Sequence, residues 1–205
     1  MTVSAQFVFD FGSPNAYLAH EVLPDIESRT GVIFEYVPIL LGGLFKLTNN
    51  RSPAETFANV QNKRAYEKRE MQRFVTKHGL TSFRANPFWP VNTLQIMRGA
   101  VASRKLDCFS LYVKAVFAAM WERELNLGDP EVIVRVLHEA GLDGRAIHAA
   151  TQDADVKERL MANTQTAFER GAFGAPTFFV SSEIFFGKDR LRDVEEEIVR
   201  QRQMD

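Results

Sequence analysis

Hydrophobic and polar positions at the start of the chain predict a strand, a helix and a second strand. Residues 5–11 (AQFVFDF) are mostly aromatic or apolar and end at a Gly-Ser-Pro turn, which is typical of a buried strand. Ser13 suits the N-cap of the helix that follows and Pro14 suits its first position, and the sequence RTG indicates its end. Residues 32–40 (VIFEYVPIL) predict the next strand. Elements of these lengths predict a βαβ unit with parallel strands.

The middle of the chain has a helical pattern. Residues 53–78 predict a polar, basic helix, and residues 81–93 are expected to be irregular because they contain closely spaced prolines and asparagines. Further helices are predicted over residues 93–106, 108–124, 130–140, 143–151 and 153–171. Near the end, Thr177–Val180 and Glu183–Phe186 predict a hairpin, and an amphipathic helix closes the chain.

This order of elements predicts an α/β protein with a thioredoxin-like fold and a large all-helical insertion. We assign residues 1–45 and 152–205 to the thioredoxin-like domain and residues 46–151 to the inserted helical domain. Ligands of open α/β sheets bind beyond the carboxyl ends of the strands, so the turn at residues 11–15 is the first place to expect a site.

A second candidate position is the sequence GAFGAPTFF, at residues 171–179. Its Pro176 comes directly before a strand that we expect at the edge of the sheet, which makes it a candidate for a cis peptide bond. A cis bond would leave the backbone of Ala175 free to pair with an extended peptide.

Composition and charge limit the possible classes of function. Of the 205 residues, 45% are hydrophobic and 25% are charged, and the net charge is −1, so we expect no binding to nucleic acid or to an anionic membrane. No apolar stretch is long enough to span a membrane and no secretory signal is evident, so we expect a cytoplasmic protein. The single cysteine, Cys108, is expected to be buried, and the four histidines have no metal-type spacing. We therefore expect no metal site, and any thiol chemistry needs a thiol from another molecule.

Five motifs carry a resemblance to a known family. They are FGSPNAYLA, NKRAYE, NPFWPVNTL, GAFGAPTFF and FFGKDRL, and they occur in this order over essentially the whole chain. Together they resemble 2-hydroxychromene-2-carboxylate isomerase, which is related to kappa-class glutathione transferases and to DsbA-type thioredoxin-fold oxidoreductases. The resemblance implies a homodimer with glutathione as its cofactor and a small aromatic or unsaturated carbonyl compound as its substrate.

The resemblance also implies which residues bind glutathione. Ser13 would be catalytic, because its hydroxyl and the positive end of its helix would favour the thiolate form of the sulfur. Ala175, before Pro176, would pair through its backbone with the cysteinyl part. The remaining implied residues contact the ends of the tripeptide: Asn50, Lys63, Lys188 and Asp189. Simpler alternatives stay open, namely a plain N-cap for Ser13, a turn proline at 176 and solvated side chains for the charged residues.

The segment NPFWPVN would form one wall of the substrate pocket. Phe88, Trp89 and Pro90 would pack against a flat aromatic substrate, and Asn86 and Asn92 would form hydrogen bonds with it. Position 89 varies in the family, so the tryptophan is a candidate for specificity rather than for catalysis. The alternative is that this segment only packs between the insertion and the sheet.

The implied reaction interconverts 2-hydroxychromene-2-carboxylate and trans-o-hydroxybenzylidenepyruvate. Reversible addition of a thiolate lets a carbon–carbon double bond rotate, and Lys63, Asn86 or Asn92 would stabilise the enolate. Two other functions remain open: a kappa-type glutathione transferase that releases the conjugate, and a non-catalytic peptide-binding module. A disulfide oxidoreductase is disfavoured, because the chain has no Cys-x-x-Cys pair. Asp10 interrupts the first strand, and the pattern assigns it no role.

Overall fold

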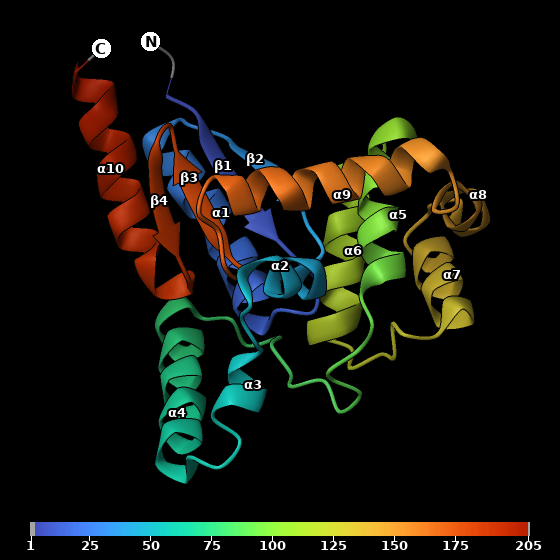
Figure 1. Ribbon diagram of the computed structural model, residues 1–205, viewed down its shortest axis with the longest axis horizontal. Helices are drawn as coiled ribbons and strands as arrows, with labels where there is room; N and C mark the ends of the chain where they lie inside the picture. Colours follow the sequence, from blue (N-terminus) through green and yellow to red (C-terminus); the bar gives the residue numbers. More distant parts are fainter. Residues whose placement is uncertain (1–2, 205) are drawn as a thin grey trace.

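A four-stranded mixed sheet forms the centre of the protein in this computed structural model, which describes residues 3–204 (Figure 1). The strands are β1 (Ala5–Phe9), β2 (Phe34–Pro38), β3 (Thr177–Val180) and β4 (Glu183–Phe186), in the spatial order β2-β1-β3-β4. β2 is parallel to β1, β3 is antiparallel to β1, and β4 is antiparallel to β3. The βαβ unit and the hairpin predicted from the sequence are confirmed.

Helices surround this sheet and fill the middle of the chain. Their bounds are α1 (Pro14–Thr30), α2 (Leu41–Thr48), α3 (Pro53–Thr56), α4 (Gln61–His78), α5 (Leu94–Lys105), α6 (Phe109–Trp121), α7 (Pro130–Glu139), α8 (Gly144–Ala150), α9 (Ala154–Glu169) and α10 (Leu191–Met204), and the 3-10 turn η1 (Lys188–Arg190) precedes α10. Each helix predicted after residue 93 is present, with ends that differ by a few residues. Of the predicted domain ranges, residues 1, 2 and 205 lie outside the described part of the chain.

The structure corrects three predictions about local structure. The helix expected over residues 53–78 is interrupted between α3 and α4, and the strand expected to reach residue 11 ends at Phe9. Cys108 is half-buried rather than buried, because it lies at the N-cap of α6 and not inside that helix.

The short helix α2 is absent from the prediction, because Gly42 and Gly43 lower its helix propensity. Tertiary contacts stabilise the start of this helix instead. The Leu40 N–H donates a hydrogen bond to Thr164 Oγ1 at 3.0 Å, and the Leu41 N–H donates one to Asp10 Oδ2 at 2.8 Å. Partners from elsewhere in the chain thus satisfy amides at the start of the helix.

The alternation of side chains along β1 divides the apolar core between the two faces of the sheet. Phe7 and Phe9 lie on the face covered by α1, α6 and α10, where the Phe7 and Phe178 rings stack with centroids 5.5 Å apart. Val8 lies on the other face, with Phe179, and packs with residues of α2 and α9. In Figure 1, α9 crosses the molecule on the side of α2, while α1 and α10 lie beside the strands. The end of β1 is therefore enclosed by packed elements.

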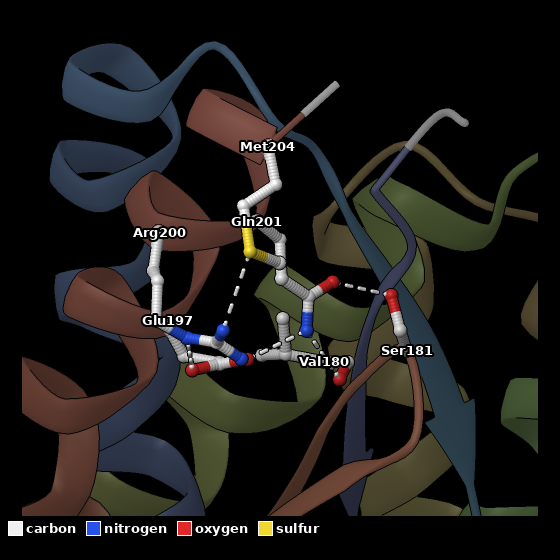
Figure 2. Close-up of polar contacts among 6 residues, drawn as sticks. All are labelled: Val180, Ser181, Glu197, Arg200, Gln201 and Met204. Carbon is white, nitrogen blue, oxygen red and sulfur yellow. Dashed lines mark hydrogen bonds and ion pairs between the residues drawn. The ribbon is translucent and has the colours of Figure 1, made fainter.

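The last helix is attached to the β3–β4 hairpin through Gln201 (Figure 2). The Ser181 hydroxyl donates to Gln201 Oε1 at 2.6 Å, and Gln201 Nε2 donates to the Val180 carbonyl at 3.4 Å. Glu197 accepts a further bond from Gln201 Nε2 at 2.7 Å and pairs with Arg200 at 2.6 Å. These contacts keep α10 alongside the hairpin, so that η1 is held next to the other end of β4.

A partly buried histidine gives the fold a dependence on pH. His20 Nδ1 lies 2.7 Å from the Tyr36 hydroxyl, and the His20 ring stacks on Phe117 with centroids 4.9 Å apart. Burial disfavours the charged imidazolium and lowers the pKa of His20 from 6.5 to about 4.

We expect the free energy of unfolding to fall as the pH is lowered from 6.5 towards 4, because in this range the unfolded chain binds a proton at His20 that the folded protein does not. His20 contributes about 3 kcal/mol to the free energy of unfolding, and this contribution is lost when the pH falls below the pKa in the folded protein. His20→Gln should remove this part of the pH dependence in urea titrations, whereas His138→Gln, at an exposed site, should retain it. Equal pH dependence in the wild type and His20→Gln would contradict this account.

Candidate functional site

Ser13 occupies the turn between β1 and α1. Its backbone is extended, with φ −92° and ψ 113°, and its hydroxyl oxygen accepts a hydrogen bond from the Ala16 N–H at 3.2 Å. Pro14 takes the first helical position, and the first turn of this 17-residue helix contains no acidic residue. The side chain thus lies at the positive end of the α1 dipole, with only 6% of the residue exposed. The prediction that Ser13 caps the helix is confirmed.

The same hydroxyl connects the turn to the start of β3. Ser13 Oγ donates a hydrogen bond to the Ala175 carbonyl at 2.9 Å, and the Ala175–Pro176 peptide bond is cis, as the sequence predicts. The antiparallel register pairs Val8 with Thr177, which brings Pro176 beside the end of β1. The prediction that this strand lies at the edge of the sheet is wrong, because β3 lies between β1 and β4. An extended peptide would therefore pair with the backbone just before β3, at Ala175, and not along the strand.

Trp89 also contacts the turn. Its indole Nε1–H donates a hydrogen bond to the Gly12 carbonyl at 2.8 Å, although the two residues are 77 positions apart. The Trp89–Pro90 bond is also cis, which the sequence analysis does not anticipate. The indole is 36% exposed and Phe88 is 53% exposed, so both rings keep surface that a ligand can cover. The aromatic wall expected from NPFWPVN is thus next to Ser13.

The two asparagines of this segment support the loop. The buried Asn86 donates from Nδ2 to the Met120 carbonyl at 2.8 Å and the Leu125 carbonyl at 2.9 Å, and its Oδ1 accepts from the Phe88 N–H at 2.8 Å. Asn92 Oδ1 accepts from the Leu94 N–H at 3.0 Å, at the start of α5. Asn86 in particular has its amide hydrogens committed to backbone carbonyls, so its geometry favours a role in holding the wall.

Three of the remaining predicted residues gather near Pro176. Asn50 Nδ2 donates to the Phe173 carbonyl at 3.0 Å, just ahead of the cis bond. The Gly187 N–H donates to the Pro176 carbonyl at 2.9 Å, and this bond places η1, with Lys188 and Asp189, at the same end of the sheet.

Within η1 the two charged residues differ in exposure. Lys188 is buried, its ammonium pairs with the Asp189 carboxylate, and it lies 4.7 Å from the centre of the Phe74 ring of α4. The Asp189 side chain is 62% exposed and so has surface left for a ligand.

Lys63 is the predicted residue that these contacts leave out. It lies on α4, where its side chain is 42% exposed and its ammonium is 3.4 Å from Glu67 and 5.2 Å from the centre of the Phe57 ring. Between residues 3 and 204, no hydrogen bond or ion pair connects it to the other predicted site residues.

Other residues at the turn escaped the sequence analysis. The Trp121 indole N–H donates to the Phe11 carbonyl at 2.8 Å, and a Cβ added to Gly12 would lie 2.9 Å from Thr93 Cγ2. Glycine is therefore favoured at position 12, because a side chain there would come too close to Thr93. The only signals in the sequence are a tryptophan within an apolar helix and a glycine in a turn.

Other features of the described residues do not compete with this site. Between residues 3 and 204, no group of three or more His, Cys, Asp and Glu side chains is arranged to bind a metal ion. In the same part of the chain, no helix is both long and apolar enough to cross a lipid bilayer. A cavity of about 370 Å³ beside Tyr36 and Arg104 and another of about 850 Å³ beside Leu47 and Met161 do not include Ser13.

The fold and the turn define a thioredoxin-fold protein without a redox cysteine pair, and comparison with known proteins gives its family. Residues 5–199 match the DSBA-like thioredoxin domain, so the chain belongs to that family. Among its relatives is 2-hydroxychromene-2-carboxylate isomerase of Sphingobium xenophagum, which is 31% identical over 197 residues, covering 93% of this chain and 95% of the relative. Glutathione S-transferase kappa 1 of Caenorhabditis elegans is 25% identical, over 90% of this chain and 86% of the relative.

The solved structures agree with this assignment. The structure of a 2-hydroxychromene-2-carboxylate isomerase superposes with a TM-score of 0.81 and 27% identity, over 98% of this chain and 96% of the other. The resemblance inferred from the five motifs is therefore confirmed, and so is the thioredoxin-like fold with its many additional helices.

We expect Ser13→Ala to lower the free energy of unfolding by about 1–2 kcal/mol, because the substitution removes the cap of α1 and the donor to a buried carbonyl. Ser52 is a matched control, since it also precedes a proline and its hydroxyl accepts from the Ala54 N–H at 3.3 Å, but it caps a short helix with no buried residue. Ser52→Ala should cost less than about 0.5 kcal/mol in the same denaturant titration. A similar loss for both variants would show that the contact with Ala175 adds nothing to the free energy of unfolding.

Proposed function

We propose that this protein is a glutathione-dependent isomerase. Its substrate would be 2-hydroxychromene-2-carboxylate, in equilibrium with trans-o-hydroxybenzylidenepyruvate, or a related unsaturated carbonyl compound. The observation that carries the proposal is the position of the Ser13 hydroxyl, at the N-terminus of α1 and 2.9 Å from the carbonyl before a cis-proline. The names of its relatives support an isomerase, and a cytoplasmic location would supply reduced glutathione.

The residues of the turn fit the thiol end of a glutathione molecule. A hydroxyl donor and the positive end of a long helix stabilise an anion, and α1 has no acid in its first turn to oppose this. The Ala175 carbonyl accepts the Ser13 hydroxyl in the described structure. Turning that hydroxyl from the carbonyl towards a sulfur needs only a rotation of the serine side chain. The carbonyl would then be available to the backbone of the tripeptide.

Bound glutathione would supply a thiolate that adds reversibly to the substrate and so allows rotation about the former double bond. The protein's own part is to lower the pKa of that thiol, to orient the substrate and to exclude water. Ser13 and the α1 amides serve the first task. Trp89 would orient the substrate, because its indole is hydrogen-bonded to Gly12 and keeps exposed surface for stacking.

The other predicted contacts fit this arrangement to different degrees. Asp189, exposed at the start of η1, is suited to the ammonium of the γ-glutamyl group. Asn50 lies next to the segment before the cis-proline and is suited to a polar group of the tripeptide backbone. Lys63 would reach a glycyl or substrate carboxylate only by giving up its pairing with Glu67.

A kappa-type glutathione transferase is the second candidate, because the chain is also similar to glutathione S-transferases kappa 1. It would use the same turn and the same thiolate but would release the conjugate. The two candidates differ in whether glutathione is consumed.

We expect the purified protein to convert 2-hydroxychromene-2-carboxylate with a catalytic amount of glutathione. The isomerisation is followed by absorbance, and free thiol is measured before and after. Constant thiol would support the isomerase, and stoichiometric loss, repeated with a generic electrophile, would support the transferase. If glutathione binds in calorimetry but neither substrate reacts, the result would contradict 2-hydroxychromene-2-carboxylate as the substrate and would support a binding module.

Ser13→Ala should raise the pKa of the bound thiol by about 1–2, because a hydrogen bond to an anion contributes about 1.5–3 kcal/mol. At neutral pH the rate should fall by about 10- to 100-fold, and it should recover partly at higher pH. The thiolate absorbance of the complex, titrated against pH, measures the pKa directly. Ser52→Ala should match the wild type. A wild-type rate in Ser13→Ala would remove this residue from the mechanism.

A further inference from the structure

Asp10 is a buried carboxylate three residues before Ser13. It is 1% exposed, in a segment that is otherwise almost entirely apolar. An unpaired carboxylate in such a place would be very unfavourable. Burial raises the pKa of Asp10, while the hydrogen bonds that it accepts act in the opposite direction.

Three donors from separate parts of the chain converge on this carboxylate. Oδ1 accepts from the Gly12 N–H at 2.8 Å, within the catalytic turn. Oδ2 accepts from the Leu41 N–H at 2.8 Å, at the start of α2, and from the Thr93 hydroxyl at 3.0 Å, at the start of α5. Their distances along the chain are 2, 31 and 83 residues. The carboxylate therefore joins the turn, the end of the βαβ unit and the helical insertion.

The backbone of Asp10 completes the turn. Its carbonyl accepts from the Ser13 N–H at 3.0 Å, while its side chain holds the preceding amide, that of Gly12. The two peptide groups that set the direction of Ser13 are thus both bonded to one residue. On the other side of the turn, the Gly12 carbonyl accepts the Trp89 indole.

The segment from Trp89 to Thr93 is consequently attached to the turn at both of its ends. One attachment is the indole bond to Gly12, and the other is the Thr93 hydroxyl bond to Asp10. The two segments also pack closely, since a Cβ added to Gly12 would lie 2.9 Å from Thr93 Cγ2.

We propose that Asp10 is a positioning residue that fixes the aromatic wall relative to Ser13. The substrate ring, stacked on Trp89, and the sulfur, held at Ser13, would then be kept in a fixed relation. The role in the reaction rests on the proposed function, whereas the role in holding the wall does not. Asp10 itself would contact neither the substrate ring nor the sulfur. It acts through its hydrogen bonds with Gly12 and Thr93.

Three variants test the hydrogen bonds that Asp10 accepts. Thr93→Val removes one hydroxyl at almost constant volume and leaves the other two bonds to Asp10 in place. Asp10→Asn puts an NH₂ group where at least one donor now points. Thr93→Ser keeps the hydroxyl and is the matched control. If Asp10→Asn does not fold, Thr93→Val and Thr93→Ser carry the test.

The first measurement needs no glutathione. The chain has two tryptophans, and each indole N–H donates to the turn, from Trp89 to Gly12 and from Trp121 to Phe11. We expect hydrogen exchange of the Trp89 indole, followed by NMR, to speed up about tenfold in Thr93→Val and Asp10→Asn. The Trp121 indole, which is 3% exposed, should change by less than about twofold, and Thr93→Ser should match the wild type. Unchanged exchange at Trp89 in Thr93→Val overturns the positioning role.

The second measurement is turnover. In Thr93→Val we expect kcat to fall about tenfold while the KM for glutathione changes less than about twofold, because the thiol site is intact and only the relation to the wall is lost. Thr93→Ser should restore kcat, and a Thr93→Ser enzyme as slow as Thr93→Val would overturn the role of the hydroxyl. If the wild type shows no glutathione-dependent reaction but exchange at Trp89 follows the expected pattern, the proposed function fails and the positioning role stands.

Discussion

The hydrogen bond from the Ser13 hydroxyl to the Ala175 carbonyl is the contact on which the candidate site depends. It joins residues 162 positions apart at the point where β1 ends and β3 begins. The antiparallel pairing of these strands brings the two residues together, and the Ala175–Pro176 peptide bond at this point is cis. One small polar group thus caps a helix and holds the start of a strand.

The site divides its tasks between the sheet and the helical insertion. Under the proposed function, the turn, the cis-proline and η1, which lie at the sheet, would hold the thiol and the γ-glutamyl end of a tripeptide. The segment with Trp89, from the predicted insertion, would then bind the second substrate beside this turn. A change in the insertion would then alter the substrate without disturbing the residues around Ser13. This is consistent with relatives named as isomerases and as transferases.

The interior of this protein is mostly apolar, and a few buried polar side chains, such as Asp10, Ser13 and Asn86, connect separate segments. Phe7, Phe9 and Phe178 pack by shape and burial, which fix the sheet but leave small displacements possible. The carboxylate of Asp10 adds directional hydrogen bonds next to the turn that carries Ser13. These bonds explain how a buried carboxyl group is accommodated beside the candidate turn.

The sequence by itself determined the strands, most helices, the cap at Ser13 and the cis bond at Pro176, because each depends on periodicity or on local backbone chemistry. Only the tertiary structure decided the rest. α2 forms across two glycines because Asp10 and Thr164 bind its first amides, and Asn86 is directed to carbonyls far along the chain. The bonds from Trp89 to Gly12 and from Thr93 to Asp10 likewise connect residues about 80 positions apart, and no local pattern encodes such distances.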